Sequence, residues 1–173
     1  MIPAAVVPLA AGLWAGGVTG SLPPADKLTV TAAASSGTGV AVASPGGGTL
    51  SGRAPVFLRA EVGFIHPQAR WLEFSPGIWM EVEGRVGFGI VPRLRALLPG
   101  RRFYPYATVS VPVVVAPYSL LGVEAGFGAA FTVHRHLALT LETTATTFFW
   151  GSDLMKGSIL ARFDAGLGVR VPF

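Results

Sequence analysis

The chain is poor in charge and contains no cysteine. Of its 173 residues, 13 are Lys or Arg and 9 are Asp or Glu, which together make 13% of the sequence, about half the share usual in a soluble domain. The absence of cysteine excludes disulfide frameworks, thiol catalysis and thiolate metal sites. Hydrophobic residues make up 51% of the chain, which excludes a disordered protein. The length suits a single domain with a real core.

Long helices are also disfavoured, because the chain holds 23 glycines and 14 prolines. Three charge-free stretches exceed the roughly 20 residues that a transmembrane helix needs, and they cover residues 2–25, 28–52 and 103–123. Pro105, Pro112 and Pro117 interrupt the third stretch, and the second is rich in glycine. Neither can form a regular spanning helix. Only residues 2–25 remain a helical candidate.

What the sequence has in abundance is a two-residue alternation, the pattern of a β-strand with one apolar face. In residues 159–173 one parity is apolar throughout, and the other carries Arg162, Asp164 and Arg170. Five more segments alternate in the same way, at residues 56–64, 78–90, 103–115, 121–133 and 137–149. Their apolar columns hold no charge. The opposite columns hold ten charges, at Arg59, Glu61, Glu81, Glu83, Arg85, Glu124, Glu142, Arg162, Asp164 and Arg170.

Alternation alone does not say which face meets water. A soluble, lipocalin-like ligand-binding barrel would point its apolar column inward, and a membrane barrel would point it outward. The polar columns are mostly Gly, Ala, Thr and Ser, and the chain has only two lysines, whereas a water-facing surface carries roughly 25 to 35% charge. The strands also exceed the roughly 5 to 6 residues usual in soluble proteins. The membrane barrel is favoured, with the soluble barrel as the alternative.

The end of the chain resembles a known family. Residues 158–173 form an alternating strand that closes on an aromatic residue, and residues 122–142 combine a glycine-rich strand, a tight turn and a strand that ends in Glu. These features resemble the C-terminal signal and the penultimate hairpin of small OmpA-type bacterial outer-membrane β-barrels. The resemblance covers residues 55–173. It implies an all-β, antiparallel up-and-down transmembrane barrel in the outer membrane of a Gram-negative bacterium, with eight strands because such barrels have even numbers.

The resemblance also implies partners. Outer-membrane lipid and lipopolysaccharide would surround the barrel, and the barrel assembly machinery would recognise its C-terminal signal during biogenesis. The residues of that signal would be Phe163, Leu167, Val169, Val171 and Phe173.

A periplasmic C-terminus would set the direction of every strand. Residues 92–102 and 133–137 would then be periplasmic turns, and residues 65–77, 116–119 and 150–157 would be external. Phe88, Phe103, Phe131 and Phe173 would lie near one rim and Phe64 and Phe149 near the other, as interfacial aromatic belts do.

The N-terminal part is less regular. Residues 1–20 are expected to be a signal peptide or a poorly defined segment, and residues 28–173 the barrel. Residues 4–14 are apolar without alternation, but no Lys or Arg precedes them, so a first strand and a helical anchor are alternatives. Residues 28–42 keep one phase, yet residues 35–39 could break them into a hairpin that completes eight strands. Otherwise a single long strand would need another from residues 4–15.

The lumen of an eight-stranded barrel is just wide enough for its own side chains, so the ten charges must pair there. We therefore expect a structural salt-bridge plug, with a narrow passive pore as the alternative. No catalytic residue, cofactor or metal site is expected, and the predicted role is structural, anchoring or surface interaction rather than enzymatic. The oligomeric state is left open.

Other motifs carry weaker signals. Three GxG pairs lie mid-strand in the polar columns and open no helix, so they indicate space in a tight lumen rather than nucleotide binding. His134 and His136 flank a turn without a nearby acid, which favours a solvated turn over a metal site. His66, Glu73 and Ser75 share a predicted external loop, which keeps a lipid A-modifying enzyme as an alternative.

The net charge of +4 does not indicate nucleic acid. Four arginines, Arg93, Arg95, Arg101 and Arg102, cluster in one predicted periplasmic turn without an RNA-binding pattern. Contacts to anionic lipid or to the cell wall are the expected use of that cluster.

Overall fold

The computed structural model describes residues 28–45, 48–84, 86–100, 102–152, 154 and 158–173. The predicted signal peptide of residues 1–20 lies outside this part of the chain. Within the described residues the strands are β1 (Thr29–Ala43), β2 (Leu50–Ile65), β3 (Leu72–Glu81), β4 (Phe88–Leu97), β5 (Phe103–Ser110), β6 (Val113–Ala116), β7 (Leu120–His134), β8 (Leu137–Gly151) and β9 (Leu160–Pro172), with one short 3-10 helix at Pro67–Ala69. No helix in these ranges is long and apolar enough to cross a membrane.

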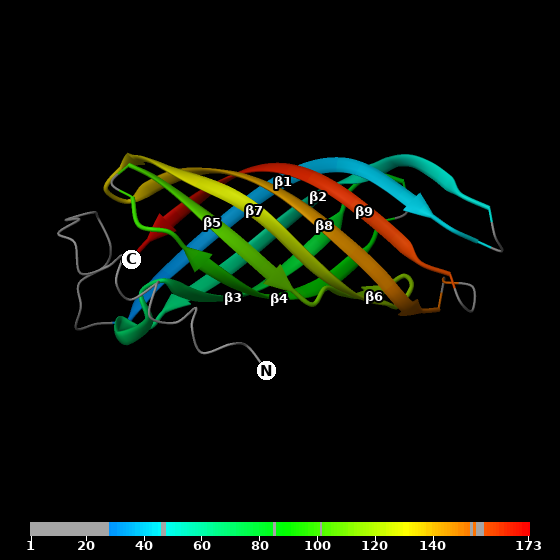
Figure 1. The fold of residues 1–173 in the computed structure, drawn as a ribbon, viewed down its shortest axis with the longest axis horizontal. Helices are drawn as coiled ribbons and strands as arrows, with labels where there is room; N and C mark the ends of the chain where they lie inside the picture. Colours follow the sequence, from blue (N-terminus) through cyan, green and yellow to red (C-terminus); the bar gives the residue numbers. More distant parts are fainter. Residues whose placement is uncertain (1–27, 46–47, 85, 101, 153, 155–157) are drawn as a thin grey trace, which may run out of the picture.

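The strands close into one antiparallel barrel (Figure 1). Chain neighbours pair from β1 to β5 and from β6 to β9, and β9 returns to pair with β1. Strands β5 and β6 both lie between β4 and β7 and therefore fill one place in the ring. The break between them falls at Pro112, which has no N–H to donate to a ladder. The ring has eight places, and the predicted eight-stranded barrel is confirmed.

The apolar columns face outward. Phe127, Phe163 and Leu167 are 75%, 58% and 69% exposed, whereas Arg59 and Glu124 on the opposite columns are buried. Apolar side chains at this density would be costly in water, at roughly 25 cal/mol per Å². This arrangement is the reverse of that in a lipocalin-like barrel, so the soluble alternative is wrong about which face is apolar.

The predicted strand at residues 78–90 is instead a hairpin. Strand β3 ends at Glu81 and β4 begins at Phe88, the Glu81 N–H bonds the carbonyl of Gly87, and Gly84 takes the positive φ that the turn requires. Residues 72–77 thus belong to β3 and residues 92–97 to β4, not to loops. The alternation test missed the turn because Met80 and Phe88 pair, share parity and both point outward.

This hairpin also supplies the eighth strand. Residues 29–43 form one continuous strand, so the predicted break at residues 35–39 is wrong. The ring closes without any contribution from residues 4–15, which lie outside the described part of the chain.

The two ends of the barrel follow from the strand directions. We call the end that holds Phe173 the C-terminal end; it also carries the β2–β3, β4–β5 and β7–β8 connections (Figure 1). The opposite, loop end carries the β1–β2, β3–β4, β6–β7 and β8–β9 connections. Residues 66–71 were predicted to lie at the end opposite the C-terminus. They instead lie at the same end as the C-terminus. The predicted aromatic rims are wrong for two members, since Phe64 closes β2 at the C-terminal end and Phe88 opens β4 at the loop end.

Candidate functional site in the barrel lumen

The inward columns have three layers: apolar, charged and apolar. Along β2, from the loop end, the buried inward residues are Phe57, Arg59, Glu61 and Ile65. Along β4 they are Val91, Arg93, Arg95 and Leu97. Each of these two strands thus contributes two charges between two apolar side chains. The charged side chains of the two strands meet inside the lumen, where Arg93 bonds Glu61.

A central charge cluster fills the middle layer; it consists of Arg59, Glu61, Arg93, Arg95, Glu124 and Glu142. Arg93 donates to Glu61 at 3.0 Å and to Glu124 at 2.7 Å, and it also bonds Glu142. Arg59 donates to Glu124 at 3.0 Å and to Glu142 at 3.3 Å. Arg95 bonds Glu61. Every carboxylate in the cluster therefore contacts at least two guanidinium groups, which offsets the cost of burying charge.

Neutral donors complete this cluster. Glu124 also accepts from Ser110 at 2.9 Å and from Thr146 at 3.1 Å, and Glu142 accepts from the Tyr106 hydroxyl at 3.0 Å. A buried carboxylate needs several donors to replace its hydration. These contacts fix the geometry of the acids and replace their hydration, whereas the arginines balance their charge.

Two smaller ion pairs flank the cluster. Toward the C-terminal end, Glu73 bonds Arg170 and lies 3.5 Å from Arg95. Toward the loop end, Arg162 bonds Glu81 and lies 3.2 Å from Asp164. In the described residues, five arginines thus face six carboxylates inside the barrel.

Apolar plugs close both ends of the lumen. The loop-end plug consists of Phe57, Trp79, Val91, Val114, Leu120 and Phe148. The C-terminal-end plug consists of Ile65, Leu97, Tyr106, Ala130 and Ala138. These side chains occupy columns that the alternation pattern marks as polar, so the pattern does not reveal them.

Arginine side chains tie the charged layer to both plugs. The guanidinium carbon of Arg59 lies 5.3 Å from the Phe57 ring centroid, and that of Arg162 lies 5.3 Å from a Trp79 ring centroid, both in the loop-end plug. Arg95 lies 5.5 Å from the Tyr106 ring in the other plug. Such cation–π contacts are favourable by about 0.5 to 2 kcal/mol. Aromatic rings thus cover one face of the Arg59, Arg95 and Arg162 guanidinium groups, whose N–H groups donate to the acids.

Glycine makes room for this packing, as the sequence predicts. A Cβ on Gly128 would overlap the ring of Tyr106, the residue that holds Glu142. A Cβ on Gly63 would likewise overlap the Glu73 carboxylate and the Thr31 hydroxyl that bonds it.

Eight of the ten predicted lumen charges do lie in the lumen. Glu83 does not: it lies in the β3–β4 turn at the loop end and pairs with Arg53 at 2.9 Å, both being exposed. Arg85 lies outside the described residues. The structure adds Arg93, Arg95 and Glu73, which sequence reasoning assigned to loops because it missed the hairpin. Their odd-numbered positions continue the inward columns of β3 and β4. That shared parity is the sequence feature that could have placed them in the lumen.

The candidate enzyme residues are separated. Glu73 and Ser75 lie inside the barrel on β3, where the Ser75 hydroxyl donates to Glu73 and accepts from Arg95. His66 is the residue after the end of β2, and its Nδ1 accepts from the Gln68 N–H at 3.2 Å. The three residues therefore do not share an external loop, and Ser75 is held by ion-pair partners rather than by an imidazole base.

The remaining predicted residues lie on the outside. Phe163, Leu167, Val169, Val171 and Phe173 follow the outward column of β9, the strand that closes the barrel against β1. His134 and His136 flank the β7–β8 turn with their ring centroids 6.1 Å apart, and the described residues hold no metal-type cluster of three or more acids or imidazoles.

An antiparallel barrel with an apolar outer wall and a charged interior is the architecture of a transmembrane β-barrel. The fold is similar to that of Neisserial surface protein A, with a TM-score of 0.54 and 17% identity over 84% of this chain and 97% of that one. It is also similar to the N-terminal β-barrel domain of Pseudomonas aeruginosa OprF, with a TM-score of 0.53 and 11% identity over 82% and 97% of the two chains.

No protein-family model matches the sequence, and no curated protein is significantly similar to it. The structural likeness establishes the fold, which is that of the small outer-membrane β-barrels, and the predicted class-level resemblance is confirmed.

Proposed function

We propose that the protein spans the bacterial outer membrane as a sealed barrel with a structural, anchoring or surface-interaction role. The outward apolar columns support the membrane setting, because they match the apolar band that lipid requires. The likeness in fold to outer-membrane barrels supports the particular membrane. The C-terminal end is the periplasmic one in this proposal, and Phe163, Leu167, Val169, Val171 and Phe173 serve recognition by the assembly machinery.

The layered lumen is the observation that supports a sealed barrel over a passive pore. Its charges pair with one another, and its ends are filled by apolar side chains. A cavity of about 20 Å³ beside Phe57, Arg59 and Tyr106 has room for about one water molecule. A permeating ion would have to separate buried ion pairs and wet an apolar plug, and both steps are costly.

An enzymatic role has no comparable support. Glu73 and Ser75 lie within the ion-pair network of the lumen and not at an exposed rim. We therefore infer a non-enzymatic protein.

Planar bilayer recording tests the sealed lumen. The full-length chain, folded in detergent, is added to a bilayer in 1 M KCl, beside a general porin as positive control. The proposal expects no discrete conductance steps. Insertion is checked separately in vesicles of the same lipid by heat-modifiable gel migration, so that silence reports on the lumen and not on failed insertion. Regular steps from the inserted protein would establish the narrow pore instead.

A further inference from the structure

The surface charge differs between the two ends of the barrel. Three arginines, Arg70, Arg102 and Arg135, lie in three different connections of the C-terminal end, and we call them the C-terminal rim. Arg102 and Arg135 are exposed and Arg70 is half-buried. Among the described residues, none of the three forms an ion pair with a carboxylate. At the loop end, by contrast, the exposed Arg53 pairs with Glu83 at 2.9 Å.

Among the residues that the structure describes, few acidic side chains lie near this rim. Glu73, the first acid of β3, is fully buried and bonded to Arg170, Ser75 and Thr31. Within the described ranges, the rim therefore presents arginines without a carboxylate partner to its surroundings.

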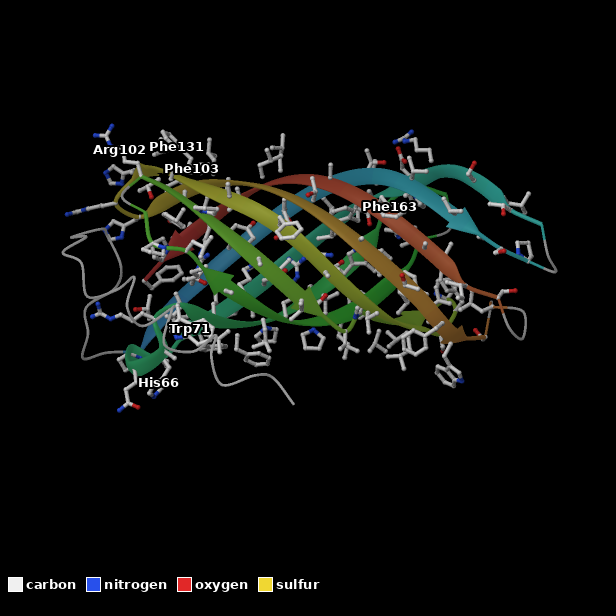
Figure 2. All side chains as sticks on the ribbon, in the orientation of Figure 1. His66, Trp71, Arg102, Phe103, Phe131 and Phe163 are labelled. Carbon is white, nitrogen blue, oxygen red and sulfur yellow. The ribbon has the colours of Figure 1, made fainter. Side chains whose placement is uncertain are left out.

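Aromatic side chains lie beside these cations. Trp71 follows Arg70 in the chain and Phe103 follows Arg102, and the two rings are 47% and 58% exposed. Phe131, 50% exposed, precedes the turn that carries Arg135. Figure 2 shows Trp71, Phe103 and Phe131 with Arg102 at this one end of the barrel. Exposed aromatics at a barrel end mark the depth of the lipid headgroups, so the neighbouring arginines lie at the level of the phosphates.

We propose that the C-terminal rim binds the phosphate groups of anionic phospholipids in the surrounding leaflet. This inference rests on the membrane-spanning role proposed above. A guanidinium fork matches a phosphate with two parallel hydrogen bonds. The three arginines lie in separate connections around the circumference, beside lipid-facing rings, so each is placed for a different lipid molecule. An acidic protein or a nucleic acid would instead need the cations gathered on one continuous face.

Fluorescence quenching by brominated lipid tests the rim directly, because Trp71 lies next to Arg70. The full-length protein is folded into phosphatidylcholine vesicles that contain a small fraction of either brominated phosphatidylglycerol or brominated phosphatidylcholine. Subtracting the signal of a Trp71→Phe variant isolates the quenching at the rim. One arginine near an anionic surface favours binding by roughly fivefold, so we expect brominated phosphatidylglycerol to associate about fivefold more strongly than brominated phosphatidylcholine.

Two further arms connect this preference to the rim. The variant R70Q/R102Q/R135Q is expected to lose the preference, whereas Arg53→Gln, at the opposite end, is expected to keep it. Raising the salt to 1 M, where the screening length is about 3 Å, is expected to weaken the preference of the unmodified protein. The salt measurement uses the unmodified protein. It therefore still tests the proposed phosphate binding if the triple variant does not fold.

Several results would overturn the inference. They are equal quenching by the two lipids in folded protein, a preference that the triple variant keeps, and a preference that salt leaves unchanged. Loss of the preference on adding inorganic phosphate at constant ionic strength would assign the rim to free phosphate instead. If neither lipid quenches Trp71 and heat-modifiable migration is absent, the membrane-spanning role itself fails.

Discussion

Arg93 of β4 and Glu124 of β7 meet inside the lumen over the intervening strand β5, and the Arg93 Nη2 donates to the Glu124 Oε1 at 2.7 Å. The same guanidinium also bonds Glu61 and Glu142. One cation thus bonds three carboxylates that come from three different strands. Because these strands lie far apart in sequence, Arg93 links parts of the barrel that backbone pairing does not join directly.

Replacing Arg93 is therefore expected to destabilise the barrel strongly. Arg93→Met keeps the volume of the stem but leaves the buried Glu61 and Glu124 and the part-buried Glu142 short of a partner, a loss of roughly 3 to 5 kcal/mol in the free energy of unfolding. Urea titration in lipid vesicles, followed by tryptophan fluorescence, measures it. Arg53→Met is the matched control, since Arg53 and Glu83 are 63% and 45% exposed and such pairs contribute about 1 kcal/mol or less. Equal stability of the two variants would contradict the central charge cluster.

Gly128 tests the tight packing of the lumen. A Cβ there would overlap the Tyr106 ring, so Gly128→Ala should displace that ring from Glu142 and lower the free energy of unfolding by about 1 to 3 kcal/mol. Gly52→Ala is the control, because a Cβ at Gly52 meets nothing within 4 Å. The same urea titration compares the two variants. If Gly128→Ala is as stable as Gly52→Ala, the lumen is wider than described.

The corrected hairpin makes a prediction about topology. The chain has no cysteine, so single cysteines can be introduced without background. Glu83→Cys at the loop end should react with a membrane-impermeant maleimide on intact cells, and His66→Cys at the C-terminal end should react only after the outer membrane is permeabilised. The continuous strand predicted from residues 78–90 would instead bury position 83 in the lumen. Labelling of position 66 but not 83 on intact cells would contradict both the hairpin and the proposed orientation.

The sequence predicted the all-β class, the closed barrel and most of the buried charges, because alternation with a period of two reports directly on the two faces of a strand. It could not locate the hairpin at Glu81 and Phe88. In an antiparallel pair, opposed residues point to the same face, and here they also share parity, so the pattern runs through the turn unbroken. The misplaced strands then hid Glu73, Arg93 and Arg95.

Two other features lay beyond pattern reasoning. Residues 35–39 resemble a turn in composition, but Gly37 and Gly39 lie within β1, where a Cβ would overlap the backbone of β9. Their role is close strand contact rather than chain reversal. The plugs were missed for a different reason. Lumen columns are recognised by the charges they carry, and a pattern of charge cannot reveal that Trp79 or Phe148 also points inward.

Spin labels along β9 test most directly whether the apolar face meets lipid. Single cysteines at residues 161–169, labelled with a nitroxide in vesicles, would be compared for collision with oxygen, which concentrates in lipid, and with a water-soluble nickel chelate. A membrane-spanning barrel with a sealed lumen predicts that oxygen accessibility alternates with a period of two and peaks at Phe163, Ala165 and Leu167, while nickel accessibility stays low throughout. High nickel accessibility at those same positions would show that the apolar wall faces water, and it would contradict the proposed membrane-spanning role.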